Sequence, residues 1–295
     1  LSMIAGTAVS IREERIAQAE RERAQRHFES VRRLADTFMF QFHDAIRDLP
    51  GATQARQLVV KTSLDYLNAL AAEPGADAGL RRDLAAAYKK VGDIQGQPYN
   101  RNLGDPAGAR RSYLSATALL EPVVRTGPHD LEARWILADA YRDLGMLVAL
   151  MGDPGRGIDT VRQAAQVLEA ATPAERGTPR VRLQMARVYR ALSVDQMYAG
   201  RNGESRAALA KSIELLESLR KSSPRDPELG VELAKSHSNL GVLLQSMPDA
   251  ATPAAIAAIE SEYARSADLL AQVIASDAVR NTAHVRNLAA AQLNL

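Results

Sequence analysis

The chain repeats one pattern at intervals of about fifty residues, and this repeat constrains its fold more than any other feature. In each copy a Leu or Met is followed directly by Ala, and in the first five copies an aromatic ring, His237 in the fifth, stands four residues after the start. Six starts recur along the 295 residues: Leu34, Leu84, Leu137, Met185, Leu233 and Leu288. The intervals between them are 50, 53, 48, 48 and 55 residues. A period of this size predicts one supersecondary unit stacked on its neighbours.

A glycine in each repeat divides the unit into two halves. Four glycines each precede the next start by 33 residues: Gly51, Gly104, Gly152 and Gly200. Twelve residues after each glycine the chain carries a small residue, in order Ser63, Ala116, Ala164 and Ser212. In the first half, positions i, i+1 and i+4 share one face of a helix, and the Ala there lets a neighbouring helix come close. Both halves are therefore predicted to be amphipathic helices.

The turns between the halves agree with two helices per unit. Gly104-Asp105-Pro106 and Gly152-Asp153-Pro154 combine a left-handed glycine, a capping Asp and a Pro in the first helical turn. The corresponding Gly200-Arg201-Asn202 predicts Asn202 as the cap. No sustained alternation of apolar and polar residues appears, so we expect an all-α fold.

The Leu-Ala-x-x-Tyr, glycine and small-residue spacing resembles the tetratricopeptide repeat, a helix–turn–helix unit of 34 residues. The resemblance implies a right-handed superhelical solenoid of antiparallel helix pairs. The commonest unit here has 48 residues, which adds seven residues to each helix if the excess is divided equally. The predicted repeats are 31–80, 81–130, 131–178, 179–227, 228–281 and a truncated 282–295, which together form one domain over 31–295.

Two segments precede these repeats. Residues 1–11 are apolar or small, but a membrane span needs about 20 such residues. They are therefore either an ordinary helix start or the end of a transmembrane helix. Residues 12–30 are predicted to be a charged stalk helix. Seven arginines and five glutamates alternate over Arg12 to Arg33, which argues against a nucleic-acid site. A solvated stalk is preferred over a homodimer formed through it.

The stretches VRRLADTFMFQFHDAIRDLPGATQARQLVVKTSLDYLNALA and LAAAYKKVGDIQGQPYNRNLGDPAGARRSYLSATALLE carry a second resemblance. They are similar to the repeat-containing C-terminal part of bacterial membrane-anchored serine/threonine protein kinases. That resemblance implies a single-pass anchor at 1–11, an extracytoplasmic repeat domain, and a sensory role in which the repeats bind a protein or peptide. The alternative is a soluble cytoplasmic scaffold or adaptor protein.

No catalytic motif is present in the chain. We find no Gly-rich phosphate loop, no H-R-D-x-x-x-x-N, D-F-G or A-P-E segment and no Walker A segment. There is no cysteine, and none of the five histidines lies three or four residues from another, so no helical metal pair exists. His43-Asp44 point in different directions on a helix, and His237 replaces a ring in the repeat pattern. We therefore expect no catalytic residue, no metal and no cofactor. Paired carboxylates in a groove, and a nucleic-acid-binding solenoid, are weaker alternatives.

The positions beside each ring supply the candidate ligand groove. On the first helices these positions hold Lys89, Arg142, Arg187, Arg190 and Lys235, with Asp139 as the one opposing acid. If the helix pairs stack into a concave surface, these residues make it basic. Arginine binds carboxylates through paired hydrogen bonds, so an acidic peptide or a C-terminal carboxylate is the predicted ligand. Ordinary solvated arginines are the alternative interpretation.

Overall fold

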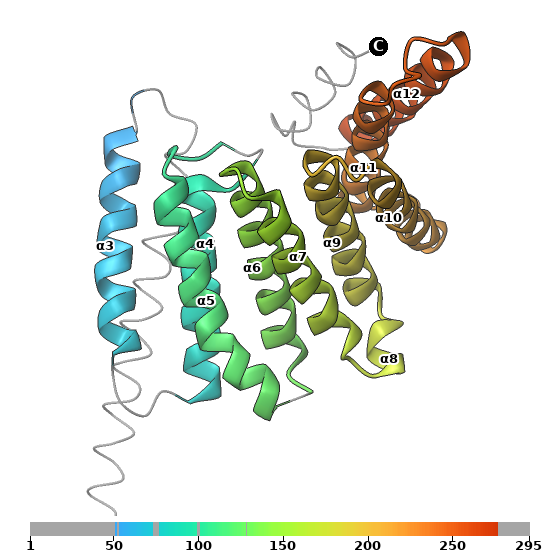
Figure 1. Cartoon of the computed structure of the whole chain (residues 1–295). Coiled ribbons are helices and arrows are strands. Elements are labelled where there is room, and N and C mark those ends of the chain that lie inside the picture. Colours follow the sequence, from blue (N-terminus) through green and yellow to red (C-terminus); the bar gives the residue numbers. More distant parts are fainter. Residues whose placement is uncertain (1–50, 52, 73–76, 99–100, 128, 277–295) are drawn as a thin grey trace, which may run out of the picture. The chain divides into compact units, whose positions relative to one another are not determined.

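The computed structural model describes residue 51 and residues 53–72, 77–98, 101–127 and 129–276 (Figure 1). The chain divides into two compact units, Leu1–Tyr66 and Leu67–Leu295. The predicted apolar stub (1–11), the stalk (12–30) and the truncated repeat (282–295) lie outside the described residues. No helix among those described is both long enough and apolar enough to cross a membrane.

In the first unit the described residues form most of helix α3 (Thr53–Ala71), which ends in the second unit. The second unit contains the remaining helices, and the described residues include no strand. These helices are α4 (Ala78–Gly96), α5 (Pro106–Thr126), α6 (Leu131–Leu150), α7 (Pro154–Glu169), α8 (Pro173–Arg176), α9 (Pro179–Tyr198), α10 (Asn202–Ser222), α11 (Pro227–Gln245) and α12 (Pro253–Ser276). For the described residues, the predicted all-α fold class is confirmed.

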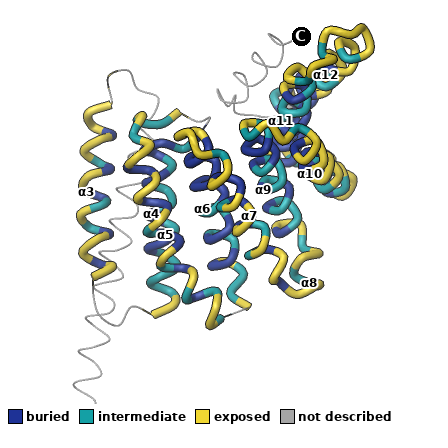
Figure 2. The backbone as a smooth tube through the Cα atoms, in the orientation of Figure 1, coloured by how far each residue is buried: buried dark blue, intermediate teal, exposed yellow. Residues whose placement is uncertain are grey.

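Within the second unit the long helices pack as consecutive antiparallel pairs (Figure 1). The pairs are α4–α5, α6–α7, α9–α10 and α11–α12, and the second helix of each pair also packs on the first helix of the next. First helices contact each other too, in the order α4, α6, α9, α11. We call these four helices the first-helix row. Figure 2 shows that buried residues line the faces between paired helices, while the outer faces are exposed.

The alanine that follows each repeat start is buried, as the spacing predicts. Ala85, Ala138, Ala186 and Ala234 are all at most 1% exposed. On the second helices the small central residues Ala116, Ala164 and Ser212 are fully buried as well. A methyl or hydroxymethyl group at these places lets two helix backbones approach closely, which explains why the repeat keeps them small.

In three of the pairs a very close helix contact, which the repeat pattern did not predict, lies at a glycine of the first helix. Eight residues after the start, three copies carry Gly92, Gly145 or Gly241. A Cβ atom built on Gly145 would lie 2.5 Å from Cγ2 of Val161, and one on Gly92 would lie 2.7 Å from the ring of Tyr113. These glycines therefore have a packing role, because the partner helix crosses where only a hydrogen atom fits.

The predicted turn chemistry is found in two of three turns. Gly104, Gly152 and Gly200 all have positive φ angles, of 73°, 101° and 73°. The side chain of Asp105 accepts a hydrogen bond from the backbone NH of Gly108, and that of Asp153 from Arg156. The predicted Asn202 cap is wrong. The turn keeps the same register, so Arg201 occupies the N-cap position and Asn202 becomes the first helical residue.

The extra length of the repeats is not always divided equally between the helices. Helices α9 and α10 have 20 and 21 residues, which matches an equal division. Helices α6 and α7 have 20 and 16, so the prediction is wrong for this pair. The remaining length forms the short helix α8, which the side chains of Thr172 and Glu175 cap reciprocally. A capping box can begin a new helix wherever it occurs, and it ends the second helix early here.

Candidate ligand-binding surface

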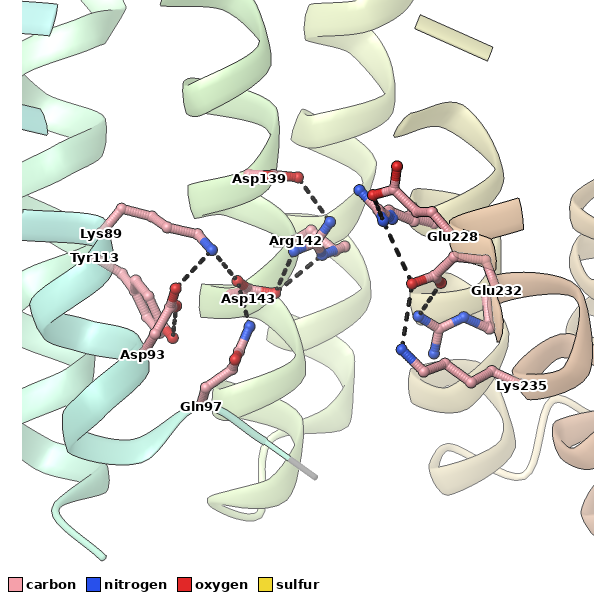
Figure 3. Close-up of polar contacts among 12 residues, drawn as sticks. Lys89, Asp93, Gln97, Tyr113, Asp139, Arg142, Asp143, Glu228, Glu232 and Lys235 are labelled. Atoms are coloured by element: carbon pink, nitrogen blue, oxygen red, sulfur yellow. Dashed lines mark hydrogen bonds and ion pairs between the residues drawn. The ribbon is translucent and has the colours of Figure 1, made fainter. Parts of the chain in front are cut away.

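All six predicted site residues lie on the first-helix row, where they form two groups of ion pairs (Figure 3). The first group, called the α4–α6 cluster, consists of Lys89, Asp93, Asp139, Arg142 and Asp143. The second group, called the α9–α11 cluster, consists of Arg187, Arg190, Glu228, Glu232 and Lys235. Each cluster joins the first helices of two consecutive pairs.

In the α4–α6 cluster one lysine bridges two carboxylates. Lys89 Nζ lies 2.9 Å from Asp93 Oδ2, one turn further along α4, and 3.0 Å from Asp143 Oδ2 on α6. Arg142 contacts Asp139 at 2.6 Å and Asp143 at 2.8 Å. Asp143 thus pairs with Arg142 of its own helix and with Lys89 of the neighbouring helix α4.

Burial and charge act in opposite directions on the two buried carboxyls of this cluster. Burial opposes ionisation of Asp143, but Arg142 and Lys89 outweigh it and hold its pKa at about 2. For Asp93 burial dominates, the adjacent Asp143 adds to it, and the pKa rises to about 6 although Lys89 opposes the change. The hydroxyl of Tyr113 donates a hydrogen bond to Asp93 at 2.9 Å.

The α9–α11 cluster is built around one glutamate. The carboxylate oxygens of Glu232 lie 3.1 Å from Arg190, 3.2 Å from Lys235 and 3.4 Å from Arg187. Arg187 also contacts the exposed Glu228 at 2.7 Å. Burial disfavours the charge on Glu232, yet the three cations hold its pKa well below the usual range. The pKa of Lys235 is lowered by burial, and Arg190 adds to this effect.

The structure corrects the charge balance expected from sequence. Asp139 is not the one opposing acid, because four further carboxylates enter the row: Asp93, Asp143, Glu228 and Glu232. The α4–α6 cluster has two cations and three carboxylates, and the α9–α11 cluster has three cations and two carboxylates. The predicted groove residues stand either two residues after the start of a repeat or directly after its ring, whereas these four acids stand at other positions. Some of these acids could have been predicted from the sequence, because an acid three or four residues from a basic residue on a helix can pair with it, as Asp93 does with Lys89.

The histidines offer no site of their own in the described residues. His237 is buried and its Nδ1 lies 2.6 Å from Glu262 Oε2, which confirms that it replaces a core ring. His129 is exposed, with Nδ1 3.6 Å from Glu175. In the part of the chain that the structure describes, no group of three or more His, Asp or Glu residues is placed to hold a metal ion. His27, His43 and His284 lie outside the described residues.

Among solved structures, the chain is similar to a thermophilic TPR protein of Thermus thermophilus, with 16% sequence identity and a TM-score of 0.37. That match covers 79% of this chain and 99% of the other. No family model matches the chain. No curated protein matches it either.

Proposed function

We propose that this chain is a non-catalytic protein-binding module, whose ligand contacts the first-helix row. The observation that carries the proposal is the arrangement of Figure 3, in which charged residues from four successive helix pairs lie along one row. Ion pairs already hold these side chains in place, so binding a ligand costs little additional side-chain entropy. Stacked helical repeats that display a long surface bind other chains in this way.

The charge balance favours an acidic group bound at the α9–α11 cluster. This cluster carries one more cation than carboxylate, and the Nε atom of Arg190 is buried without a hydrogen-bond partner. Arg187 and Lys235 keep part of their surface in contact with solvent. The α4–α6 cluster has an excess carboxylate and is therefore a poor place for an acid. Of the six predicted groove residues, we assign the ligand's carboxylate to Arg187, Arg190 and Lys235.

The proposed context is the extracytoplasmic sensory region of a membrane-anchored serine/threonine kinase. The sequence resemblance over Val31 to Glu121 supports it, and the catalytic domain would then precede Leu1. A soluble cytoplasmic scaffold is the second candidate, because stacked helix pairs serve equally well there. The reading frame upstream of Leu1 separates the two: a kinase domain followed by a full hydrophobic span supports the first, and a start codon near Leu1 supports the second.

Two variants that both remove the ion pairs of Glu232 with Arg187 and Arg190 test the assignment of the ligand's carboxylate. In Arg187→Gln/Arg190→Gln the cations are lost, whereas in Glu232→Gln the competing carboxylate is neutralised and the cations remain. Peptides ending in an acidic residue, and amidated copies, are titrated and followed by fluorescence anisotropy. The double variant is expected to bind acidic peptides roughly tenfold or more weakly, which corresponds to one lost charged hydrogen bond. Glu232→Gln is expected to bind them more tightly.

Arg206→Gln is the matched control, because Arg206 is an exposed arginine on the second helix α10. It should leave the affinity unchanged. Both test variants lose the pairs of Glu232 with Arg187 and Arg190, and both are expected to be less stable, so affinity changes of opposite sign cannot arise from unfolding. Equal affinities for wild type, the double variant and Glu232→Gln would reject the α9–α11 cluster as a binding site.

A further inference from the structure

Asp195 is a buried carboxyl group without a partner. It lies near the end of α9 and is 1% exposed, and neither of its oxygen atoms makes a hydrogen bond. Buried carboxyl groups in proteins are normally hydrogen-bonded or paired with a cation. Asp195 is neither, and the α9–α11 cluster and its proposed ligand do not use it.

The repeat shows that this position is an apolar core position in the other described pairs. Ten residues after the start, the four first helices of the described pairs carry Ile94 in α4, Leu147 in α6, Asp195 in α9 and Leu243 in α11. The three aliphatic residues are at most 5% exposed. Asp195 is therefore the one copy among these four in which an ionisable group replaces a core side chain.

The same register indicates which contact Asp195 occupies. Leu147 belongs to a core cluster with Ala109 and Tyr113 of α5, the second helix of the preceding pair. One repeat later the preceding second helix is α7, which packs on α9. The position of Asp195 thus corresponds to the contact between α7 and α9, where two helix pairs meet.

Among the described residues, no cation lies close enough to Asp195 to offset a negative charge on it. On α9 itself, Arg187 and Arg190 bind Glu232 of α11. On the neighbouring helices α6 and α7, three arginines have partners elsewhere: Arg142 with Asp143 on α6, Arg162 of α7 with Asp159 and with Glu204 of α10, and Arg134 of α6 with the carbonyl of Val167. Glu204 also accepts a hydrogen bond from Gln196, next to Asp195.

We propose that Asp195 makes the α7–α9 contact a pH-responsive joint within the array of helix pairs. When protonated, its side chain packs as a neutral group in place of the usual leucine. When ionised, it leaves an uncompensated charge in the core, which favours states in which α9 separates from α7 and the carboxylate reaches water. The joint would let the array respond to proton concentration near neutrality, independently of what the first-helix row binds.

The direction of the pH effect follows from burial. Burial alone raises the pKa of Asp195 to about 7, well above its ordinary value of 3.8. A carboxyl whose pKa is raised in the folded state stabilises that state fully below the ordinary value. The stabilisation is lost as the pH rises through the folded-state value. From pH 5 to pH 6, ionisation of this residue in the unfolded chain therefore lowers the folding constant by about tenfold, and from pH 6 to pH 7 by about fivefold, because the folded-state carboxyl begins to ionise as well.

The test compares the full chain with Asp195→Asn, which mimics the protonated side chain, and with Asp195→Leu, which restores the residue found in α6 and α11. Urea unfolding is followed by circular dichroism from pH 5 to pH 8. The folding constant of wild type relative to Asp195→Asn is expected to fall about fiftyfold between pH 5 and pH 7. Asp195→Leu should be more stable than wild type at pH 8. Asp268→Asn, a change of an exposed Asp on α12, should follow wild type.

Hydrogen exchange locates the effect in the molecule. At pH 7.5, amides of α7 and α9 in wild type are expected to lose protection relative to Asp195→Asn, while those of α4 and α5 do not. A constant ratio of folding constants over the pH range would overturn the proposal. So would a loss of protection that is uniform along the described helices. Ligand binding is measured at one fixed pH, so its failure would leave this test unaffected.

Discussion

At the scale of single residues, the absence of a side chain is as informative as its presence. Gly145 faces α7 so closely that an added Cβ would lie 2.5 Å from Val161 and 2.8 Å from the carbonyl oxygen of Gly157. The second contact is with backbone, which cannot rotate away as a flexible side chain can. By contrast, an added Cβ on Gly203, in the first turn of α10, meets no atom within 4 Å.

These two glycines predict opposite results for the same substitution. Gly145→Ala is expected to destabilise the protein by about 1–3 kcal/mol, because α6 and α7 must separate to admit the methyl group. Gly203→Ala is expected to stabilise it by about 0.4–1 kcal/mol, because alanine restricts the unfolded chain. Urea unfolding at one pH measures both. Similar values for the two variants would contradict the close α6–α7 contact.

At the scale of the elements, the turns between paired helices show how strongly the backbone register is kept. Asp153 and Arg201 occupy the same place after their glycines, with backbone angles of −121°/73° and −89°/58°. Asp153 caps α7 with its side chain, but Arg201 makes no such bond to α10. The turn therefore tolerates the loss of its cap while the helix still begins at the expected residue.

This comparison predicts that removing the cap at one turn and adding it at the other change the stability in opposite directions. Asp153→Ala should cost about 1 kcal/mol through the lost N-cap bond. Arg201→Asp should gain a comparable amount, because the new carboxylate can accept from the first turn of α10 and also lies favourably at the helix N-terminus. Thermal unfolding detects both changes. A destabilised Arg201→Asp would mean that the α10 turn differs from the α7 turn.

At the scale of the whole molecule, stability depends on contacts between consecutive helix pairs, and buried charges join several of them. Lys89 reaches Asp143 across α4 and α6, and Arg190 reaches Glu232 across α9 and α11. In stacked arrays each unit contacts only its neighbours, so one altered interface can separate the array into parts. The titrating carboxyl groups lie at such interfaces.

These groups predict an unusual pH profile for the folded chain. Asp143 and Glu232 have lowered pKa values, so their stabilisation is present above the ordinary range and is lost as the pH falls. Asp93 and Asp195, raised to about 6 and about 7, lose theirs as the pH rises. The two effects balance near pH 4, where we expect the unfolding free energy to be largest.

The fluorescence of the single tryptophan can be used to measure this pH profile. Trp135 on α6 has the guanidinium of Arg180 on α9 stacked 3.5 Å from its ring centroid, so its fluorescence reports the contact between two pairs. Unfolding free energies between pH 3 and pH 8 give the profile, and Asp195→Asn should shift the maximum upward. A stability that rises steadily from pH 4 to pH 8 would contradict the assignment of the raised groups.

Much of the fold followed from residues that lie close together in the chain. Helix propensity, the spacing of small and apolar residues, and the Gly-Asp-Pro turns all act over a few residues, so they predicted helices and turns without knowledge of neighbours. Ala138 and Ala164 could be assigned to the core because their positions recur. The Asn202 cap was predicted wrongly, because the turn has the same length as the others and therefore places Arg201 at the N-cap. The length of α7 was not predicted, because a capping box starts the separate helix α8 between the two pairs.

The partners of the charged residues were decided by the tertiary structure. Periodicity placed Arg142, Arg187 and Arg190 on the first helices, but the lateral offset between adjacent helices determines which carboxylates reach them. That offset depends on close contacts such as Gly145 against Val161, which no single helix contains. Asp195 illustrates the same difference between sequence and tertiary structure. Its position in the repeat, ten residues after Met185, follows from the sequence alone. Its lack of any partner is a property of α9 together with the helices packed on it, because burial and electrostatic compensation arise only when distant segments pack.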